Sequence, residues 1–510
     1  MNSIQYTKNG EHTYFDLYLH SHWECSVIIF SGFNSIHFHL THPMPQRPHI
    51  FYEFTRALCS KCLKTVDAKI IFQDERVYML KHCFEHGEER VLISTDIPYF
   101  KSQKDYYKPG DQVEHFSTET IHGCPHDCGI CPDHEQHACL SIVEITDKCN
   151  LTCPVCFAHS DPTKDHKSIE EIEKIFDTIC AHEAEPDLVQ ISGGEPTIHP
   201  DFFEILDRAK KRPFRYLMVN TNGIRIAEDE AFVKRLASYQ PNFEIYLQFD
   251  SFDKDYLKKI RGADLTKIRM KAIENLNKYD ISTTLVVVVE KGQNDHEIGK
   301  ILEFATSQSC IRGVTFQPVQ GEGRTDGYDP STDRSTLTEV RQAILDQFPT
   351  FEGRDIVPLP CHPENIAMGY ALKIAGKIIP LGRYIDRDEL LKWAENTIIF
   401  ERNPEFKKHF FDLFSLGKNG ESATNCFSSL LCCLPRIQMA EKLSYKNIFR
   451  ILIISFMDRY DMDLRSVKRA CVMFPQSDGK LYPFDTFNLF YRQKYERKKR
   501  IEGMKKDFGK

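Results

Sequence analysis

Three cysteine residues lie within eight positions of one another, directly after a strand-like run. They are Cys149, Cys153 and Cys156, with gaps of three and then two residues, and they follow the apolar run at 141–145. Three thiolates at this spacing can each bind one iron of a 4Fe-4S cluster, which leaves the fourth iron without a protein ligand. An open iron can exchange an electron with a bound molecule. The motif therefore predicts a redox-active cluster, with purely structural thiols as the alternative.

A glycine-rich turn follows the next strand-like run. It reads Gly193, Gly194, Glu195 and Pro196. The glycines have no Cβ, so a ligand could approach the backbone closely, and the carboxylate could accept hydrogen bonds from an ammonium group. We expect this turn to bind the molecule that reaches the open iron. Polar residues at later strand ends could face the same molecule or could be polar rim residues: Asn220, Asn222, Gln248, Asp250 and Gln317.

A second cysteine motif repeats the gaps of the first. Cys124, Cys128 and Cys131 are followed by Cys139, so we expect an auxiliary cluster with four protein ligands. Cys139 or a cysteine further along the chain could complete it, and a second metal ion or a tight loop of thiols is the alternative. The remaining candidates for a third cluster are Cys361, Cys426, Cys432, Cys433 and Cys471.

A third pattern, near the N-terminus, is typical of a single metal ion. Cys59 and Cys62 precede a predicted hairpin with strands at 69–72 and 77–80, and Cys83 and His86 follow it. The hairpin would return the second pair to the first, and four such ligands suit tetrahedral zinc or a single iron. The alternative is a pair of buried thiols beside an exposed histidine.

Strand-like runs alternate with helical patterns from residue 141 to 330. A helix is expected to start at Ser168, which opens a capping box. Six strands with intervening helices predict an α/β fold with parallel strands, here a partial (βα)6 barrel whose chemistry lies at the carboxyl ends of the strands. The six runs are Ser141–Ile145, Leu188–Ile191, Tyr216–Val219, Glu244–Phe249, Thr284–Val289 and Gly313–Phe316.

Five segments follow from these patterns. We expect a poorly ordered extension at 1–45, a metal-binding ribbon at 46–120, the second cysteine segment at 121–140 and the partial barrel at 141–330. An α+β region with the last cysteines and a basic tail is expected at 331–510. The last twenty residues hold nine Lys or Arg against three Asp or Glu.

Composition narrows the class of protein. The 510 residues carry 66 Lys and Arg against 73 Asp and Glu, a net charge of −7, which disfavours nucleic-acid binding driven by charge. We expect no membrane-spanning helix and no secretory signal. The 18 cysteines are clustered, and without a secretory signal we expect such cysteines to be metal ligands rather than disulfides. We therefore expect a cytoplasmic protein, and the basic tail allows a peripheral contact with the inner membrane face.

The cysteine motif at 149–156 and the turn at 193–196 together resemble the radical S-adenosylmethionine (radical SAM) superfamily. The resemblance implies that the cluster binds S-adenosylmethionine and cleaves it to a 5′-deoxyadenosyl radical, which abstracts a hydrogen atom from a substrate. The electron would come from a flavodoxin- or ferredoxin-type donor. This hydrogen abstraction needs no general acid or base, and the sequence identifies no catalytic residue.

The chain from about 44 to 492 resembles a narrower family, which includes archaeal tetraether lipid synthases and a dihydropterin methylase. The resemblance rests on the motifs above and on Asp478-Gly479 with Pro483-Phe484. It implies two or three 4Fe-4S clusters and one zinc or rubredoxin-like iron. This chain departs from the family at Asp485 and at Ala470, where cysteines are often found, which leaves the third ligand set open.

The leading functional expectation is C–C bond formation on a lipid chain after abstraction of hydrogen from an unactivated C–H bond. The alternative is radical methylation of a pterin-like small molecule, and a more distant one is a non-catalytic iron–sulfur electron carrier. A lipid needs a long apolar tunnel, whereas a polar heterocycle needs several convergent hydrogen-bonding groups. The carrier needs no cofactor pocket, so the glycine-rich turn argues against it.

Overall fold

The structure is a computed structural model of the chain. It describes four strands within the first 47 residues, and then residues 48–108, 115–325, 327–374, 376–383, 385, 387–393 and 447–492. The chain divides into two compact units, Met1–Ile50 and Phe51–Lys510, each of which is described by itself. Cys426, Cys432, Cys433 and the basic tail from residue 493 lie outside the described residues.

The first unit, where a poorly ordered extension is expected, contains four strands. They form an antiparallel sheet in the order β1-β2-β3-β4, in which each strand pairs with the next one along the chain. Its strands are Ser3–Lys8, Glu11–Leu19, Cys25–Ser31 and Asn34–His39. Apolar Phe15, Leu17 and Leu19 alternate with Asp16 and Tyr18, a pattern that is typical of a strand.

The second unit begins with a four-stranded antiparallel ribbon, which contains the predicted hairpin. Its strands are β5 (Ile50–Leu58), β6 (Thr65–Gln73), β7 (Arg76–Cys83) and β8 (Gly87–Ser94). Asp74 and Glu75 both have positive φ in the two-residue turn between β6 and β7, a geometry that matches the twist of a hairpin. The short helix α1 (Ile97–Ser102) follows.

The six predicted barrel strands are all present and form a parallel sheet in chain order. They are β9 (Leu140–Glu144), β11 (Leu188–Ser192), β12 (Tyr216–Thr221), β13 (Phe243–Gln248), β14 (Thr283–Val289) and β15 (Ile311–Pro318). Nearly every residue of these strands is buried, as expected for strands covered on both faces.

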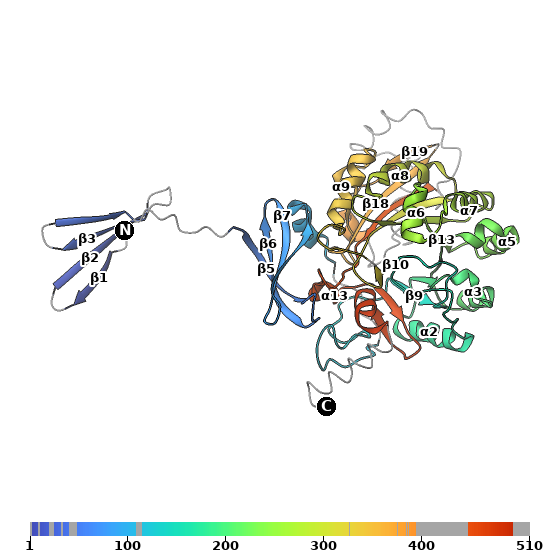
Figure 1. The fold of residues 1–510 in the computed structure, drawn as a ribbon, viewed down its shortest axis with the longest axis horizontal. Coiled ribbons are helices and arrows are strands. Elements are labelled where there is room, and N and C mark those ends of the chain that lie inside the picture. The colour runs from blue at the N-terminus through green and yellow to red at the C-terminus, as the bar shows by residue number, and fades with distance from the viewer. Residues whose placement is uncertain are drawn as a thin grey trace, which may run out of the picture. The chain divides into compact units, whose positions relative to one another are not determined.

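Helices cover the outer side of this sheet (Figure 1). The hydroxyl of Ser168 accepts a hydrogen bond from the backbone N–H of Glu171 and so caps the first of them, at the predicted start. The helices are α2 (Ile169–His182), α3 (Phe202–Lys210), α4 (Ile224–Glu228), α5 (Glu230–Ala237), α6 (Lys254–Arg261), α7 (Thr266–Lys278) and α8 (Ile298–Ser307).

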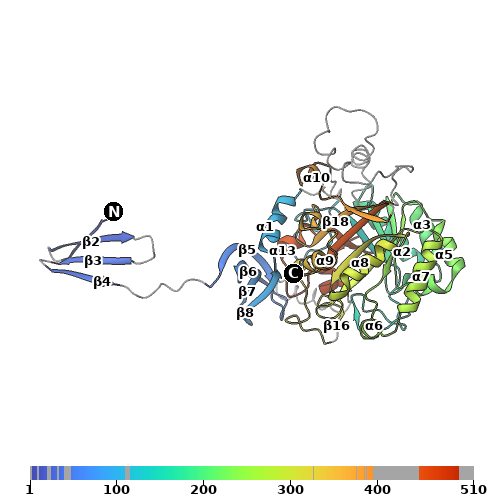
Figure 2. The same ribbon diagram turned by 90° about the horizontal axis from the view of Figure 1, so that it is seen from above.

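The C-terminal region extends the same sheet at both of its edges (Figure 2). Strand β20 (Ile448–Ile454) lies parallel to β15, and β21 (Val472–Pro475) lies parallel to β9. The other elements are α9 (Leu337–Gln347), β17 (Val357–Pro358), β18 (Ile366–Ile374), β19 (Lys377–Pro380), α10 (Arg387–Trp393), α13 (Leu464–Val467), β22 (Leu481–Pro483) and α14 (Phe484–Thr486).

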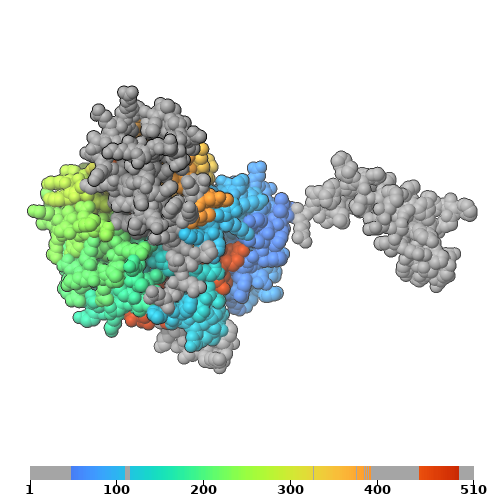
Figure 3. Space-filling view, turned by 180° about the vertical axis from the view of Figure 1, so that it is seen from behind, coloured from blue at the N-terminus to red at the C-terminus, as the bar shows by residue number. Residues whose placement is uncertain are grey.

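Residues Phe51–Lys510 form one compact unit, which is not divided at the expected boundaries of 120, 140 and 330. Figure 3 shows part of segment 447–492, in red, between the blue ribbon and the cyan residues that precede the barrel. The hydroxyl of Thr55 in the ribbon donates a 2.6 Å hydrogen bond to Asp463, and the backbone N–H of Glu135 donates to the carbonyl of Lys468. In the described part of the chain, no helix combines the length and apolarity needed to span a membrane.

Candidate active site

A cavity lies at the carboxyl ends of the barrel strands. Of the predicted residues it is lined by Cys156, Gly193, Gly194, Asn220, Gln248 and Gln317. Its volume is about 160 Å³. The structure therefore brings together residues from the cysteine motif, the glycine-rich turn and three later strand ends, as the fold class predicts.

The first cysteine motif forms a loop at this end of the sheet. Cys149 and Cys153 are buried, Cys156 is half-buried, and all three are free thiols. Burial raises the pKa of Cys149 to about 12, although the backbone N–H of Leu151 donates to its sulfur. Each thiol of a 4Fe-4S cluster binds a different iron, and three free thiols on one loop are the donor set that such a cluster requires. The residues present therefore fit the cluster.

A second loop, which contains Arg324, clamps the cysteine loop. The sequence did not reveal this contact. The short strand β16 (Arg324–Thr325) pairs with β10 (Val155–Cys156). The guanidinium of Arg324 donates to the carbonyls of Cys153, at 2.6 Å, and Ser160, at 3.0 Å. The cysteine loop thus depends on residues more than 160 positions further along the chain.

Gly323 lets these loops approach. Its φ is +77°, and a Cβ at this position would lie 2.6 Å from the carbonyl oxygen of Cys156. We expect Gly323→Ala to displace the loop and to lower the iron content of the anaerobically reconstituted protein, by about half or more of the cluster at this site. The matched control is Gly292→Ala, because Gly292 has φ of +69° but no atom within 4 Å of the position that a Cβ would take. An equal loss of iron in both variants would contradict the role of the clamp.

The glycine-rich turn also has a packing role within the protein. A Cβ on Gly193 would lie 2.2 Å from the carbonyl oxygen of Thr146, and one on Gly194 would lie 2.2 Å from that of Lys148. The backbone N–H of Gly194 donates to Thr146 and that of Glu195 to Lys148. The glycines therefore let the turn pack against the start of the cysteine loop, in addition to lining the cavity.

The carboxylate of Glu195 is engaged within the protein. It accepts hydrogen bonds from the hydroxyl and the backbone N–H of Thr197, the hydroxyl of Thr221 and the backbone N–H of Asn222, at 2.6 to 3.2 Å. Three of these bonds reach Oε1 and one reaches Oε2. Burial raises its pKa despite these bonds. In this arrangement Glu195 holds the ends of two strands together.

Asn222 and Asp250 are not among the residues that line the cavity. The side chain of Asn222 donates a 2.7 Å hydrogen bond to Asn150 and so supports the cysteine loop. Asp250 is fully buried and accepts two hydrogen bonds from Arg261, at 2.8 and 2.6 Å, and one from Arg269, at 2.9 Å.

Arg261 is a residue of the cavity wall that the sequence did not single out. It lines the cavity and lies beside Cys153. The pKa of the Cys153 thiol is raised, because the effect of burial outweighs the lowering effect of the positive charge on Arg261. Asp250 holds this guanidinium in place. A signal was available, because Arg261 lies four residues after Leu257 on the buried face of α6, where a charged residue needs a buried partner.

The second cysteine motif forms a loop shaped by an aspartate. The carboxylate of Asp127 accepts three backbone N–H groups, from Ile121, His122 and Gly123, each at 2.7 Å. The pKa of Cys124 is raised by burial and by the neighbouring thiols Cys128 and Cys131. These three cysteines therefore lie on one loop, as predicted.

Cys139 does not lie with them. Its sulfur groups with those of Cys361 and Cys471, all within 4.8 Å of one another, and the last two are 3.7 Å apart. The three thiols form no disulfide and are almost completely buried. Strand pairing explains the regrouping, because Cys139 precedes β9 and Cys471 precedes β21, its parallel neighbour. The third ligand set thus gains Cys139 among the described residues.

The ribbon brings the four predicted ligands of a single ion together. The Nδ1 atom of His86 lies 3.5 Å from the sulfurs of Cys59 and Cys83, and the sulfurs of Cys62 and Cys83 are 3.9 Å apart. Ligands about 2.0 to 2.3 Å from one tetrahedral ion lie at such separations. Burial opposes ionisation of Cys59, but backbone N–H groups in the turn donate to its sulfur and lower its pKa to about 7.

We expect Cys62→Ser to weaken metal binding at the ribbon. Replacing one thiolate should remove close to one equivalent of zinc or iron per chain during dialysis against a chelator, because a hydroxyl is a poor ligand for either ion. Metal analysis by mass spectrometry measures this loss. Cys180→Ser is the control, since Cys180 lies on α2 outside every cysteine group. Equal metal content in both variants would contradict the site.

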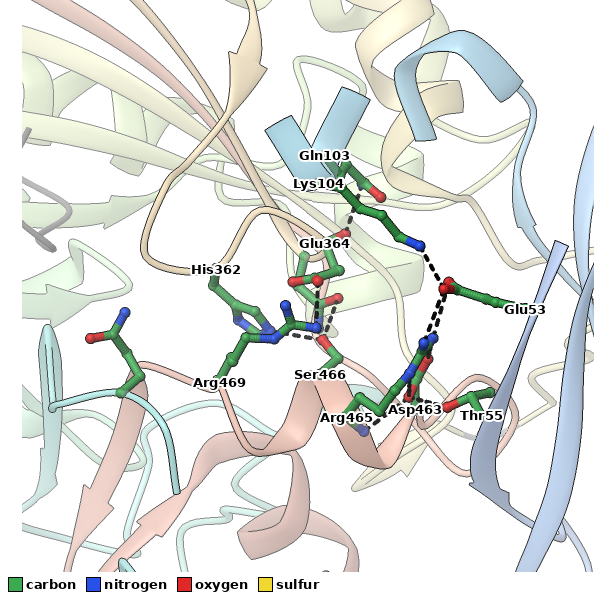
Figure 4. Close-up of polar contacts among 12 residues, drawn as sticks. Glu53, Thr55, Gln103, Lys104, His362, Glu364, Asp463, Arg465, Ser466 and Arg469 are labelled. Atoms are coloured by element: carbon green, nitrogen blue, oxygen red, sulfur yellow. Dashed lines mark hydrogen bonds and ion pairs between the residues drawn. The ribbon is translucent and has the colours of Figure 1, made fainter. Parts of the chain in front are cut away.

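A polar network connects the ribbon to the loop that carries Cys361 (Figure 4). Glu53 in β5 pairs with Lys104 at 2.6 Å and with Arg465 at 3.2 Å. Ser466 directly follows Arg465, and its hydroxyl lies 2.9 Å from Nε2 of His362, the residue after Cys361. The network fixes the segment 463–469 between the ribbon and the buried cysteine group.

Comparisons with known proteins agree with this geometry. Residues 143–305 match the family described as the radical SAM superfamily, and residues 51–95 match the HMPTM N-terminal zinc ribbon domain. The chain is 28% identical over 484 residues to a 7,8-dihydro-6-hydroxymethylpterin dimethyltransferase of Methanocaldococcus jannaschii, covering 87% of this chain and 95% of that protein.

Two further matches are partial. A probable GTP 3′,8-cyclase of Thermococcus kodakarensis is 30% identical over 171 residues, which cover 33% of this chain and 53% of that protein. The crystal structure of SuiB of Streptococcus suis bound to S-adenosylmethionine matches with a TM-score of 0.33 and 17% identity, over 41% of this chain and 46% of that one. Members of the superfamily bind a 4Fe-4S cluster and S-adenosylmethionine. With its cysteine loop, its partial barrel and the match over residues 143–305, the chain contains a radical SAM domain and is an enzyme.

Proposed function

We propose that this enzyme alkylates a small, flat, polar heterocycle of the pterin kind, most specifically by methyl transfer to a carbon that first loses hydrogen. This is the alternative that the sequence left open, and it takes precedence over coupling of lipid chains. A relative that covers 87% of this chain carries a name that describes methylation of a dihydropterin.

The observation that carries the proposal is the chemistry of the cavity wall. The polar side chains of this wall include five amides, two arginines, a serine, a tyrosine and a glutamate. The amides are Gln190, Asn220, Gln248, Gln317 and Gln320, and the others are Arg261, Arg492, Ser192, Tyr246 and Glu144. Several convergent hydrogen-bonding groups suit the cofactor together with a polar heterocycle, whereas a lipid tail would leave both polar atoms of Gln320 without a partner.

The rest of the wall is apolar and aromatic. Phe456 and Phe484 stack with ring centres 3.6 Å apart, and Phe157 meets both edge-on. Flat rings pack well against such faces. The present volume is below the ~300–1,000 Å³ usual for small-molecule sites, so we infer that this wall shifts when ligands fill the cavity.

The residues have distinct roles in this proposal. Cys149, Cys153 and Cys156 would hold the cluster, and Gly193, Gly194, Asn220, Gln248 and Gln317 would surround S-adenosylmethionine. When bound, these two groups supply the 5′-deoxyadenosyl radical. Arg261 would place positive charge beside Cys153. The aromatic wall would exclude water from the reacting atoms.

The auxiliary sites are part of the same proposal. Cys124, Cys128 and Cys131 would bind one further cluster, and Cys139, Cys361 and Cys471 another metal centre. Cys59, Cys62, Cys83 and His86 would bind one zinc or iron. A flavodoxin- or ferredoxin-type protein would supply electrons in the cytoplasm, and the basic tail leaves a peripheral membrane contact as the alternative location.

The test is substrate-dependent cleavage of S-adenosylmethionine by the reduced, reconstituted protein. Dihydro-6-hydroxymethylpterin should raise the yield of 5′-deoxyadenosine, and, with a small-molecule cell extract to supply one-carbon donors, mass spectrometry should detect the pterin with added methyl groups. A cellular lipid extract is the parallel arm. Stimulation by lipid alone would overturn the proposal in favour of lipid-chain chemistry.

A further inference from the structure

Gln320 is a buried amide in the cavity wall whose polar atoms have no partner. The residue is 2% exposed and lines the cavity. Among the described residues, neither its amide oxygen nor its amide nitrogen has a hydrogen-bond partner. Buried polar groups are nearly always satisfied, because an unpaired one loses its bonds to water without replacement. A molecule that enters the cavity would supply both missing bonds.

The loop that carries Gln320 is fixed on both sides. The backbone N–H of Gly321 donates a 2.9 Å hydrogen bond to Asp458, and Glu322 pairs with Arg459 at 2.9 Å. Gly323 then packs against the backbone of Cys156. Gln320 is therefore held close to the cysteine loop by a segment that has little freedom to move away, as a specific recognition group requires.

Strand order separates Gln320 from the glycine-rich turn. Gln320 follows β15, whereas Gly193 and Gly194 follow β11, and three strands lie between these two. On the other side of β15 lies β20, which leads to Phe456 of the aromatic stack. Gln320 thus lies on the side of the cavity that carries the aromatic wall.

We propose that Gln320 recognises the substrate by two hydrogen bonds to a cyclic –CO–NH– edge of a flat heterocycle that packs against the Phe456–Phe484 stack. The inference rests on the proposed function and specifies its substrate class. A carboxamide offers one donor and one acceptor side by side, which complements such an edge. An alkyl chain would satisfy neither atom.

The test compares ligand binding by Gln320→Leu and Gln320→Glu with that of the wild type. Equilibrium dialysis of the reconstituted, unreduced protein measures binding of dihydro-6-hydroxymethylpterin and, separately, of S-adenosylmethionine. We expect Gln320→Leu to weaken pterin binding about 10- to 100-fold, because both bonds are lost. Gln320→Glu should show a smaller loss, because it can still accept from the ring N–H. Binding of S-adenosylmethionine should change less than about twofold.

Gln342→Leu, on an exposed turn of α9, is the control for the substitution itself, and iron content with circular dichroism checks that each variant is folded. Unchanged pterin binding by Gln320→Leu would overturn the inference, as would a loss confined to S-adenosylmethionine, which would assign Gln320 to the cofactor. If the wild type binds no pterin, the proposed function fails, and guanosine then tests the same edge on another ring. Guanosine binding that depends on Gln320 would support the inference, and no binding would overturn it.

Discussion

Cys156→Ala should abolish cleavage of S-adenosylmethionine. The yield of 5′-deoxyadenosine from reduced, reconstituted protein is expected to fall by at least about 1,000-fold, since only the cluster delivers the electron that the reaction needs. Iron content should fall by about four per chain, the content of one 4Fe-4S cluster. Cys156 is the half-buried member of the motif and lines the cavity, so its removal disturbs little packing.

The matched control is Cys180→Ala, a half-buried thiol on α2 outside all of the cysteine groups. It should retain full iron content and full cleavage. Anaerobic reconstitution followed by chromatography of the nucleoside product measures both variants in parallel. Cleavage at the wild-type rate in Cys156→Ala would contradict the assignment of the cluster to this loop.

Asp250→Asn should destabilise the protein by about 3–5 kcal/mol, because it leaves Arg261 and Arg269 buried with no neutralising charge. The change keeps the shape of the side chain, so the loss reports the charge. The midpoint of urea unfolding under anaerobic conditions measures it. Reconstitution of the cluster should also fall, since Arg261 lies beside Cys153.

The effect of Asp250→Asn should depend on pH. Burial by itself would raise the pKa of Asp250, but the two guanidinium groups outweigh it and hold that pKa well below its usual range. A carboxyl group with a depressed pKa stabilises the fold above its ordinary value of about 3.9 and loses this contribution as the pH falls towards the folded-state value. The difference in stability between wild type and variant should therefore shrink below about pH 4.

Asp255→Asn is the control for this pair of experiments. Asp255 lies in the first turn of the same helix, but its side chain is 73% exposed and pairs with Lys258 at 3.2 Å. An exposed pair contributes about 0–1 kcal/mol. Equal destabilisation by the two substitutions would contradict the view that Asp250 is the buried counter-ion of Arg261.

The sequence by itself determined the local elements and the metal-binding motifs. The six barrel strands, the helix capped by Ser168 and the hairpin of the ribbon were all predicted, because hydrophobic period, caps and turns act over a few residues. The motifs at 149–156 and at 59–86 were predicted for the same reason, since the ligands of each lie on one loop or one hairpin.

Only the tertiary structure decided which distant residues meet. It placed Cys139 with Cys361 and Cys471 rather than with the nearer Cys131, because β9 pairs with β21. It engaged Glu195 in bonds within the protein, paired Asp250 with Arg261, and brought Gly323 against Cys156. Long-range strand pairing and the need to satisfy buried polar groups set these contacts, and neither leaves a pattern in a short stretch of sequence.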